Sequence, residues 1–468
     1  MASEKSKFNY KKLLILALCF AVYFALISIN TPDGLSENGQ KAIALMIVAI
    51  ILWVSEIIPI GVSSVLLLVM PEVLGIVPMP ESLSNFMIPT VIFIYSAFII
   101  AQALTASGFG NRISLVVSSL FGTEPDKVLL SFMLPTTVIS SVLLDIPTAL
   151  IFGGLAYSLL QKNNCQPGKS NFGKSMMVGI PVAAAMGGIG TPAGSGLNIL
   201  SMSLLESTSG VKINFLQWSL IGIPMSIILT LVSWFVIKKM YPAEIDRVEG
   251  LDDVKQELKD LGSLSTAEKK FAGIFLVTLI LWFTSPWTGI NATVVSIITA
   301  SVFFLPGIEL VNWKNIKDRI GWDSLFLVGS ANSLAMMLVS TGASAWIANT
   351  FLGGLSNSNM LVLLLAVSAF GVFSHLIVPV ANAVLAVAIP IVAVLAEQAG
   401  INPAYLVLPI AFTASDVFLL PLDPIPMTTY NYGYWKMSDM IKPGVIISLI
   451  WIVLNVIFML GVQLINLV

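Results

Sequence analysis

Charged residues are scarce in this chain. Asp, Glu, Lys and Arg make up 10% of the 468 residues, against about 25% in a typical soluble domain. Hydrophobic residues make up 57%, and the mean hydropathy is +0.93. Apolar stretches of roughly 18 residues or more, the length of a membrane-spanning helix, recur along the chain. The composition therefore predicts an all-α protein that crosses a membrane several times.

Cysteine and histidine are also rare, which excludes several kinds of site. The two cysteines, Cys19 and Cys165, are isolated and argue against a disulfide framework or a thiolate metal site. The single histidine, His375, leaves no histidine cluster for a metal ion. The sequence has no phosphate-binding P-loop, so ATP-driven transport is not expected. No enzyme constellation remains, and the net charge of −2 without a basic stripe gives no sign of a nucleic-acid partner.

The placement of lysines predicts the orientation in a plasma membrane. Residues 1–12 carry four lysines before an apolar run, so we expect a cytoplasmic N-terminus and a retained first span over 13–29; a cleaved signal peptide is the alternative. Residues 238–270 are polar and lysine-rich with helical spacing, and they predict a cytoplasmic connector between two halves. Residues 320–435 contain no Lys or Arg, so loops there, like the C-terminus, are expected outside.

Two long apolar segments are predicted to form re-entrant hairpins. Segment 128–160 is long for one span and short for two, and lysines flank both ends, so it would enter and leave at the cytoplasmic face. Asp145 and Pro147 mark its tip, because a charge and a helix breaker interrupt an apolar helix there. Segment 359–396 has the same form, with its tip near 378–382, and would enter from outside. Two ordinary helices joined by a tight loop are the alternative.

Each hairpin is followed by a helix that the sequence predicts to be broken. Residues 183–205 hold five glycines around Pro192, and residues 413–433 hold three prolines around Asp423. The order span, hairpin, broken helix, span occurs in both halves, in opposite membrane orientation. Two inverted repeats with interrupted helices predict a secondary transporter with a site near the membrane midplane. A passive pore and a non-transporting receptor are the alternatives from other classes.

The expected site holds no cationic side chain. Neither hairpin and neither broken helix contains Lys or Arg, so an anion would be bound by neutral donors and by helix N-termini. Asp145 and Asp423 occupy corresponding places beside the two breaks. Each is interpreted either as part of a cation or proton site or as a cap of the adjacent helix. For Asp416 and His375, the sequence allows either a functional role or a structural role in packing.

Three segments resemble the divalent anion/sodium symporter family, also called INDY, and the resemblance covers nearly the whole chain. They are "LWVSEIIPIGVSSVLLLVMPEVLGI" (52–76), "WDSLFLVGSANSLAMMLVSTGASAWIA" (322–348) and "LPLDPIPMTTYNYGYWKMSDMIKPG" (420–444). The resemblance implies about eleven spans plus two re-entrant hairpins, a homodimer, and an elevator movement of a transport domain against a scaffold. It also implies substrates such as succinate, malate, α-ketoglutarate, citrate or sulfate, of which dicarboxylates are favoured.

The resemblance also divides the chain. Residues 1–127 and 271–357 would hold the scaffold helices, residues 128–237 and 358–468 the transport domain, and residues 238–270 the connector.

Site residues follow from the resemblance at the two tips and the two breaks. Those expected to contact the substrate are Pro147, Thr148, Gly190, Thr191, Ser195, Ala381, Asn382, Pro424 and Pro426. Those expected beside a cation or proton are Asp145, Gly194, Val380 and Asp423.

Both tips depart from the family pattern. Sodium-coupled members carry Ser-Asn-Thr at each tip, where this chain has Ile-Pro-Thr (146–148) and Val-Ala-Asn (380–382). Loss of those oxygens should weaken sodium binding unless Asp145 and Asp423 replace them. Some members exchange one carboxylate for another without sodium, and they also depart from the tripeptide. We therefore expect carboxylate exchange with no cofactor and no sodium, in preference to sodium- or proton-coupled symport.

Overall fold

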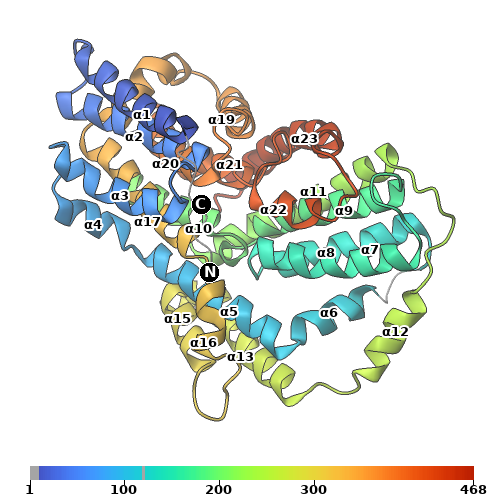
Figure 1. The fold of residues 1–468 in the computed structure, drawn as a ribbon. Coiled ribbons are helices and arrows are strands. Elements are labelled where there is room, and N and C mark those ends of the chain that lie inside the picture. The colour runs from blue at the N-terminus through green and yellow to red at the C-terminus, as the bar shows by residue number, and fades with distance from the viewer. Residues whose placement is uncertain (1–9, 119–121) are drawn as a thin grey trace.

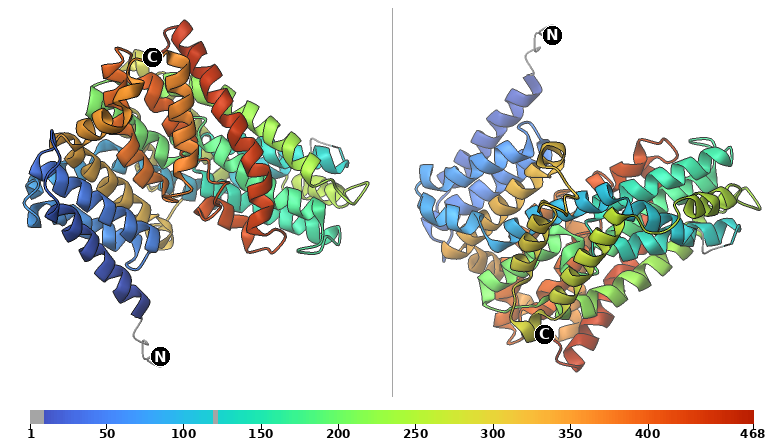
Figure 2. Two further views of the ribbon diagram at one scale, coloured as in Figure 1. Left: turned by 90° about the horizontal axis from the view of Figure 1, so that it is seen from above. Right: turned by 90° about the horizontal axis from the view of Figure 1, so that it is seen from below.

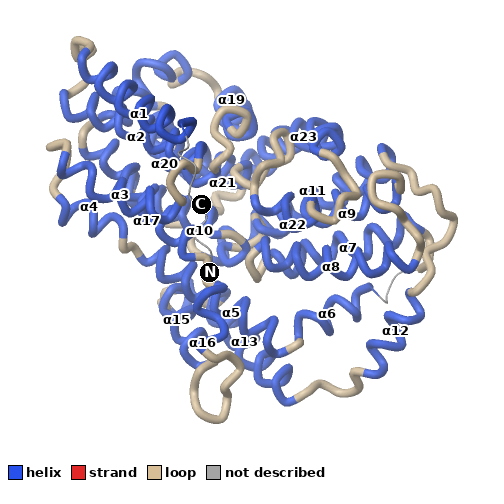
Figure 3. Tube along the Cα trace, viewed as in Figure 1, coloured by secondary structure: helices blue, strands red, loops and turns tan. Residues whose placement is uncertain are grey.

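The chain forms a bundle of helices, as the computed structural model of residues 10–118 and 122–468 describes it (Figures 1 and 3). No strand occurs in those ranges, which agrees with the all-α prediction. The first half contains α1 (Tyr10–Ser28), α2 (Glu37–Ser55), α3 (Ile60–Val73), α4 (Met79–Phe86), α5 (Pro89–Ser107), α6 (Phe109–Ser118), α7 (Pro125–Ser140), α8 (Asp145–Lys162), α9 (Asn171–Gly188), the 3₁₀ turn η1 (Pro192–Gly194), α10 (Gly196–Ser209) and α11 (Phe215–Met240).

The second half is also helical. It contains α12 (Leu251–Asp260), α13 (Thr266–Phe283), α14 (Ser285–Thr288), α15 (Ala292–Val302), α16 (Trp313–Ile316), η2 (Lys317–Arg319), α17 (Trp322–Ser340), α18 (Ala343–Ile347), the π-helical η3 (Ala348–Leu352), η4 (Gly353–Leu355), α19 (Met360–Ser374), α20 (Ala381–Gln398), α21 (Ala404–Thr413), α22 (Pro424–Tyr430) and α23 (Met437–Leu464).

Six described segments are long and apolar enough to cross a membrane. They are α2, Met79–Ser107 (α4 with α5), α11, α17, α20 and α23; five shorter apolar helices accompany them. The first predicted span agrees with α1, which projects from one edge of the molecule in Figure 2. Part of the lysine-rich start that carries the orientation prediction, residues 1–9, lies outside the described residues.

The first predicted hairpin folds as two helices with a short turn. α7 ends at Ser140, residues 141–144 turn, and α8 begins at Asp145. The expectation that Pro147 breaks a helix is wrong. Pro147 stands in the first turn of α8, where a backbone N–H has no partner within the helix, so proline removes no helical hydrogen bond. The helix is interrupted before Asp145 rather than after it.

The other three predicted interruptions lie where the sequence places them. The second hairpin consists of α19 and α20, separated by residues 375–380. The first broken helix stops at Gly188 and resumes as α10. The second stops at Thr413 and resumes as α22.

The polar connector is shorter than predicted. α11 continues to Met240 and α13 starts at Thr266, so both ends of the predicted range 238–270 belong to long helices. Between them lies α12, the helix that the polar spacing indicates. The guanidinium of Arg112 in α6 donates to both carboxylate oxygens of Glu268 at the start of α13, at 2.7 and 3.1 Å. This pair joins the segment before the first hairpin to the end of the connector.

The two halves repeat one packing scheme. In the first half α7 contacts α9, α8 contacts α9, and α11 contacts α7 and α9; in the second half α19 contacts α21, α20 contacts α21, and α23 contacts α19 and α21. Contacts also cross between the halves, because α8 packs on α22 and α10 packs on α20. The helix that leaves each hairpin tip therefore lies against the helix that resumes after the opposite break.

Two of the segments that carry the family resemblance pack against each other. Asp323 at the start of α17 accepts a hydrogen bond from the N–H of Gly61 in α3, at 3.0 Å. The hydroxyl of Ser330 donates to the carbonyl of Ser64 at 3.0 Å. The indole N–H of Trp53 donates to the hydroxyl of Ser64 at 3.2 Å. Residues 52–76 and 322–348 thus form one packed unit.

Candidate functional site

The first hairpin tip is locked onto the first break. The hydroxyl of Thr191 donates to the carbonyl of Ser141 in the tip, and the hydroxyl of Ser140 donates to the carbonyl of Ala184 in α9 at 2.6 Å. Thr191 is fully buried. Its side chain, expected to contact a substrate, is therefore used to hold the tip in place.

Glycines permit this close approach. A Cβ on Gly187 would lie within 3.0 Å of the backbone of Thr137, and one on Gly190 would lie 2.6 Å from the hydroxyl of Ser141. A Cβ on Gly194 would collide with the carbonyl of Gly188. Only glycine fits at these positions, because backbone atoms cannot move aside as a flexible side chain can.

Carbonyls freed by the first break find partners within the protein. The side-chain amide of Asn198 donates to the carbonyls of Gly188 and Thr191, at 2.6 and 2.8 Å. The indole N–H of Trp218 donates to the carbonyl of Ile189 at 2.9 Å. The backbone carbonyls of Gly188, Ile189 and Thr191 are therefore hydrogen-bonded within the protein. Sequence reasoning did not identify Asn198; a buried amide in an apolar helix is the signal that points to it.

Asp145 and Asp423 stand at the starts of two helices, but only Asp423 is an N-cap. Asp145 is the first residue of α8 and is 7% exposed; it accepts from the N–H of Ile146 at 2.8 Å, and the N-cap residue Leu144 provides no side-chain cap. Asp423 is the N-cap of α22 and accepts from the N–H of Ile425 at 3.0 Å. The capping interpretation therefore fits Asp423 and does not fit Asp145. They do not occupy equivalent places: the repeat matches Asp145 with Ala381, the first residue of α20, and Asp423 with Ser195, the N-cap of α10.

The starts of α10 and α20 are uncapped. Neither Ser195 at the start of α10 nor Val380 at the start of α20 provides a side-chain cap. The third N–H of each helix bonds to the carbonyl of its N-cap residue, whereas the first two N–H groups have no acceptor among the described residues. The side-chain oxygen of Asn382, in the first turn of α20, is buried and has no partner in the described structure. Two helices that start with free donors therefore pack against each other.

The predicted site residues differ in accessibility. Pro424 is exposed, and Pro147, Asn382 and Asp423 are partly exposed. The remaining substrate candidates are buried; these are Thr148, Gly190, Thr191, Ser195, Ala381 and Pro426. The hydroxyl of Thr148 donates to the carbonyl of Leu144 at 3.0 Å and is used inside α8.

Asp416 lies within the second break, and His375 lies at the start of the second hairpin tip. Asp416 is fully buried and accepts from the hydroxyl of Ser448 in α23, at 2.9 Å. His375 ends α19 and is 3% exposed, and its ring faces the carbonyl of Thr413 without closing a hydrogen bond of normal geometry. Asp416 thus connects the break to α23, and His375 lies where α19 and α21 end.

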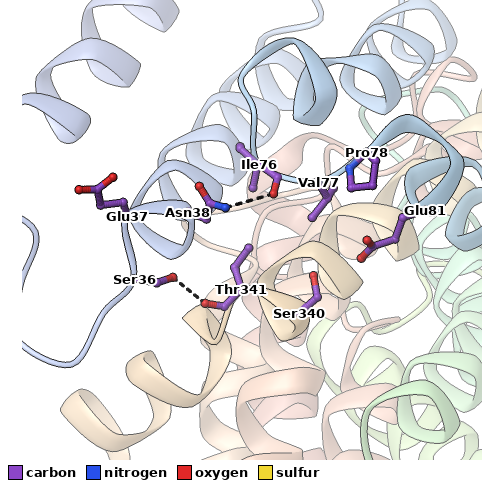
Figure 4. Close-up of a pocket in the computed structure, with 9 residues that line it drawn as sticks. All are labelled: Ser36, Glu37, Asn38, Ile76, Val77, Pro78, Glu81, Ser340 and Thr341. Carbon is purple, nitrogen blue, oxygen red and sulfur yellow. Dashed lines mark hydrogen bonds between the residues drawn. The ribbon is translucent and has the colours of Figure 1, made fainter.

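A polar hollow lies elsewhere on the protein. Figure 4 shows an open pocket of about 650 Å³ between the start of α2, the loop before α4 and the end of α17. The hydroxyl of Ser36 donates across it to the carbonyl of Thr341 at 2.9 Å. Glu37 and Glu81 are its charged residues, which do not suit an anion, and it contains none of the predicted site residues.

Comparison with known families and proteins identifies a family of membrane transporters. The family model "Sodium:sulfate symporter transmembrane region" matches residues 10–466. The sodium-dependent dicarboxylate transporter SdcS of Staphylococcus saprophyticus is 26% identical, over 97% of this chain and 92% of that protein. Its Staphylococcus aureus counterpart is 26% identical over 96% and 91%. A protein of Cupriavidus necator described as a membrane protein is 26% identical over 86% and 83%.

Two solved structures share the fold. The YdaH transporter of Alcanivorax borkumensis superposes with a TM-score of 0.56 at 13% identity, over 80% of this chain and 86% of that one. MtrF of Neisseria gonorrhoeae superposes with a TM-score of 0.58 at 10% identity, over 97% and 95%. At such identities the likeness concerns the fold alone.

Proposed function

The chain belongs to the sodium:sulfate symporter family of membrane transporters, and we propose that it carries dicarboxylates of the succinate, malate and α-ketoglutarate class across the plasma membrane by exchange, without sodium. The observation that supports an anionic substrate most directly is the pair of uncapped helix starts at α10 and α20. Free N–H groups at helix N-termini bind carboxylates, and the side-chain NH2 group of Asn382, in the first turn of α20, is a further donor beside them.

The proposal that transport is not coupled to sodium is based on the residues at the two hairpin tips. The sequence there reads Ile-Pro-Thr (146–148) and Val-Ala-Asn (380–382), and the hydroxyl of Thr148, the one hydroxyl of these two tripeptides, is hydrogen-bonded inside α8. A sodium ion needs several oxygen ligands, and side-chain oxygens are few here. An exchanger needs no driving ion, because the returning carrier is loaded with a second carboxylate.

We propose the following architecture for this activity. About eleven spans and two re-entrant hairpins form the chain, which works as a homodimer. Residues 128–237 and 358–468 move as an elevator-like transport domain against residues 1–127 and 271–357. The contacts of α8 with α22 and of α10 with α20 support a single moving unit, since they join both hairpins to both breaks.

Cation-coupled symport is the second candidate, and two observations favour it. The named staphylococcal relatives are sodium-dependent. Asp145 and Asp423 also stand at the starts of α8 and α22, two helices that pack together, and a pair of carboxylates attracts a cation. Under this alternative the substrate is a dicarboxylate, citrate or sulfate, and sodium or a proton travels with it.

The substrate class is tested by binding and competition in proteoliposomes. Labelled succinate should be displaced by malate and α-ketoglutarate at far lower concentrations than by sulfate. The variant Asn382→Ala should weaken binding roughly 10- to 100-fold, since a hydrogen bond to a charged group contributes about 1.5–3 kcal/mol. The matched control is Asn312→Ala, which removes the cap of α16 far from the tips. Preferential displacement by sulfate, or an unaltered affinity of Asn382→Ala, would contradict the proposal.

A further inference from the structure

An apolar groove of about 660 Å³ lies between α11 and α23, which pack against each other. The two helices are antiparallel. At one end, the hydroxyl of Tyr241 after α11 donates to the carbonyl of Asp439 in the first turn of α23, at 2.7 Å. At the other end, the side-chain amide of Gln217 in the first turn of α11 donates to the carbonyl of Leu467 after α23, at 2.8 Å. The groove is lined by the C-terminal part of α11 and the N-terminal half of α23, so it lies toward the Tyr241 end.

The walls of this groove are apolar and open away from the protein. Leu231 and Phe235 of α11 and Ile446 of α23 are exposed, and Ile450 continues the wall of α23. The red ribbon of α23 lies on the outer surface of the bundle in the left view of Figure 2. Both helices are long and apolar enough to cross a membrane. An exposed apolar face on two such helices contacts the hydrocarbon chains of lipids.

Two lysines stand at one end of the groove. Lys239 of α11 lines it, and its Nζ lies 5.7 Å from the centroid of the Phe235 ring. Lys442 precedes Ile446 by four residues and therefore lies on the same face of α23. Because the helices are antiparallel, both lysines lie at the Tyr241 end. Both side chains are exposed, and neither has an acidic partner among the described residues.

The neighbouring lysines are already paired. Lys238 forms an ion pair with Asp126 at 3.6 Å, and its Nζ lies 3.9 Å from the centroid of the Trp234 ring. Lys174 forms an ion pair with Asp439 at 3.4 Å. The charges of Lys239 and Lys442 are therefore the ones that remain for an external anion at the end of the groove. Trp234 places this end near the membrane–water interface, where tryptophan is enriched.

We propose that the groove binds one anionic phospholipid, whose phosphate lies between Lys239 and Lys442 and whose acyl chain fills the apolar part. Each lysine is eight residues from the far end of its wall, at Leu231 in α11 and at Ile450 in α23. Eight residues correspond to about 12 Å of helix, which approaches the depth of about 15 Å that one leaflet contributes to the hydrocarbon core.

The charge of the two lysines selects the headgroup. An anionic headgroup neutralises them, whereas a zwitterionic headgroup brings a cation of its own that the lysines repel. The lysine distribution predicts that this end of α11 is cytoplasmic, and the cytoplasmic leaflet is the one that carries anionic lipids. The lipid would also join the last long helix of each half. A ligand that binds only the folded protein raises its melting temperature.

The experiment is native mass spectrometry of the purified, delipidated protein in a nonionic detergent. It is titrated with palmitoyl-oleoyl phosphatidylglycerol or with phosphatidylcholine that has the same acyl chains. We expect phosphatidylglycerol to bind one site per chain at least tenfold more tightly, and to raise the melting temperature more.

Two kinds of variant test the two parts of the site. Lys239→Gln combined with Lys442→Gln should weaken phosphatidylglycerol binding at least tenfold. The matched control, Lys269→Gln combined with Lys314→Gln, removes the same charge from exposed positions on α13 and α16 and should leave the affinity unchanged. Ile446→Trp fills the apolar part, keeps both lysines, and should also weaken binding.

Several outcomes would overturn the lipid site. Equal affinity for the two lipids, or an equal loss in both double-lysine variants, would mean that no specific headgroup site exists. Unaltered binding by Ile446→Trp, or displacement of the lipid by millimolar glycerol phosphate, would mean that the acyl chain does not occupy the groove. Groove variants that dissociate a dimer without changing lipid binding would assign the groove to a second copy of the chain. If the variants fail to fold, the comparison of the two lipids on the unaltered protein still decides.

Discussion

Tyr157 of α8 stacks on Tyr432, with ring centroids 4.5 Å apart and an angle of 24° between the rings. Tyr157 belongs to the first hairpin, whereas Tyr432 follows the second broken helix. Each half of the chain therefore completes the other. Neither repeat builds its hairpin surroundings alone, because α8 also packs on α22 and α20 also packs on α10 from the opposite half.

Removing this stack should loosen the contact between the halves. Tyr157→Ala is expected to lower the melting temperature of the purified protein, with about 0.5–1.5 kcal/mol lost from the aromatic pair in addition to the lost burial. Tyr157→Phe keeps the ring and should restore most of the stability. Equal melting temperatures for the alanine and phenylalanine variants would show that stacking contributes nothing.

The glycine at position 187 should be sensitive to a single methyl group. Gly187→Ala places a carbon against the backbone of Thr137 and pushes the first hairpin away from α9, at a cost of about 1–3 kcal/mol. Gly273→Ala is the matched control, since a Cβ there meets no atom within 4 Å. Thermal unfolding of both variants checks the prediction. Similar behaviour of the two would mean that the tip and the break are not tightly packed.

A new carboxylate at an uncapped helix start should compete with the substrate. Val380→Asp would cap α20 and stabilise the protein by about 0.5–1 kcal/mol, while it fills the donors proposed to hold the anion. We expect transport to fall at least tenfold with no loss of fold. Val380→Ile keeps a β-branched apolar side chain that cannot cap the helix, and should retain transport. Normal uptake by Val380→Asp would place the anion elsewhere.

Glu244, in the loop after α11, should stabilise the folded protein in a pH-dependent way. Burial opposes ionisation of Glu244, but hydrogen bonds from the hydroxyl of Ser170 and from the N–H of Phe172 outweigh it, so the pKa of Glu244 lies below its ordinary value. Such a group stabilises the folded state above its ordinary pKa, and that contribution is lost as the pH falls through the lowered value.

The difference in melting temperature between the unaltered protein and Glu244→Gln should therefore be constant near neutral pH. It should shrink below about pH 4.5, where the carboxylate of the unfolded chain is protonated. A difference that grows on acidification would contradict the assigned hydrogen bonds.

Local signals predict the interruptions well. Glycine and proline act on the backbone at their own positions, so the breaks around Pro192 and Asp423 could be placed from sequence. Pro147 is an instructive exception. Proline is compatible with the first turn of a helix, and sequence alone does not show whether the helix stops before or after it.

Partners between distant segments could not be predicted in the same way. Gly153 and Thr429 meet although they are far apart in the chain, and no local pattern links them. For the same reason the sequence suggests Asp145 and Asp423 as equivalent positions, whereas the fold gives them different places in the repeat, at the starts of α8 and α22, which pack together. The hydroxyl of Thr191 was likewise assigned to a substrate, although the hairpin tip uses it.

Exchange without sodium is the central claim, and uptake into reconstituted vesicles tests it most directly. Labelled succinate is supplied outside vesicles that contain either unlabelled succinate or none, each with and without an inward sodium gradient. We expect uptake only into the loaded vesicles, at rates that sodium does not alter. Uptake into empty vesicles that follows the sodium gradient would contradict the account.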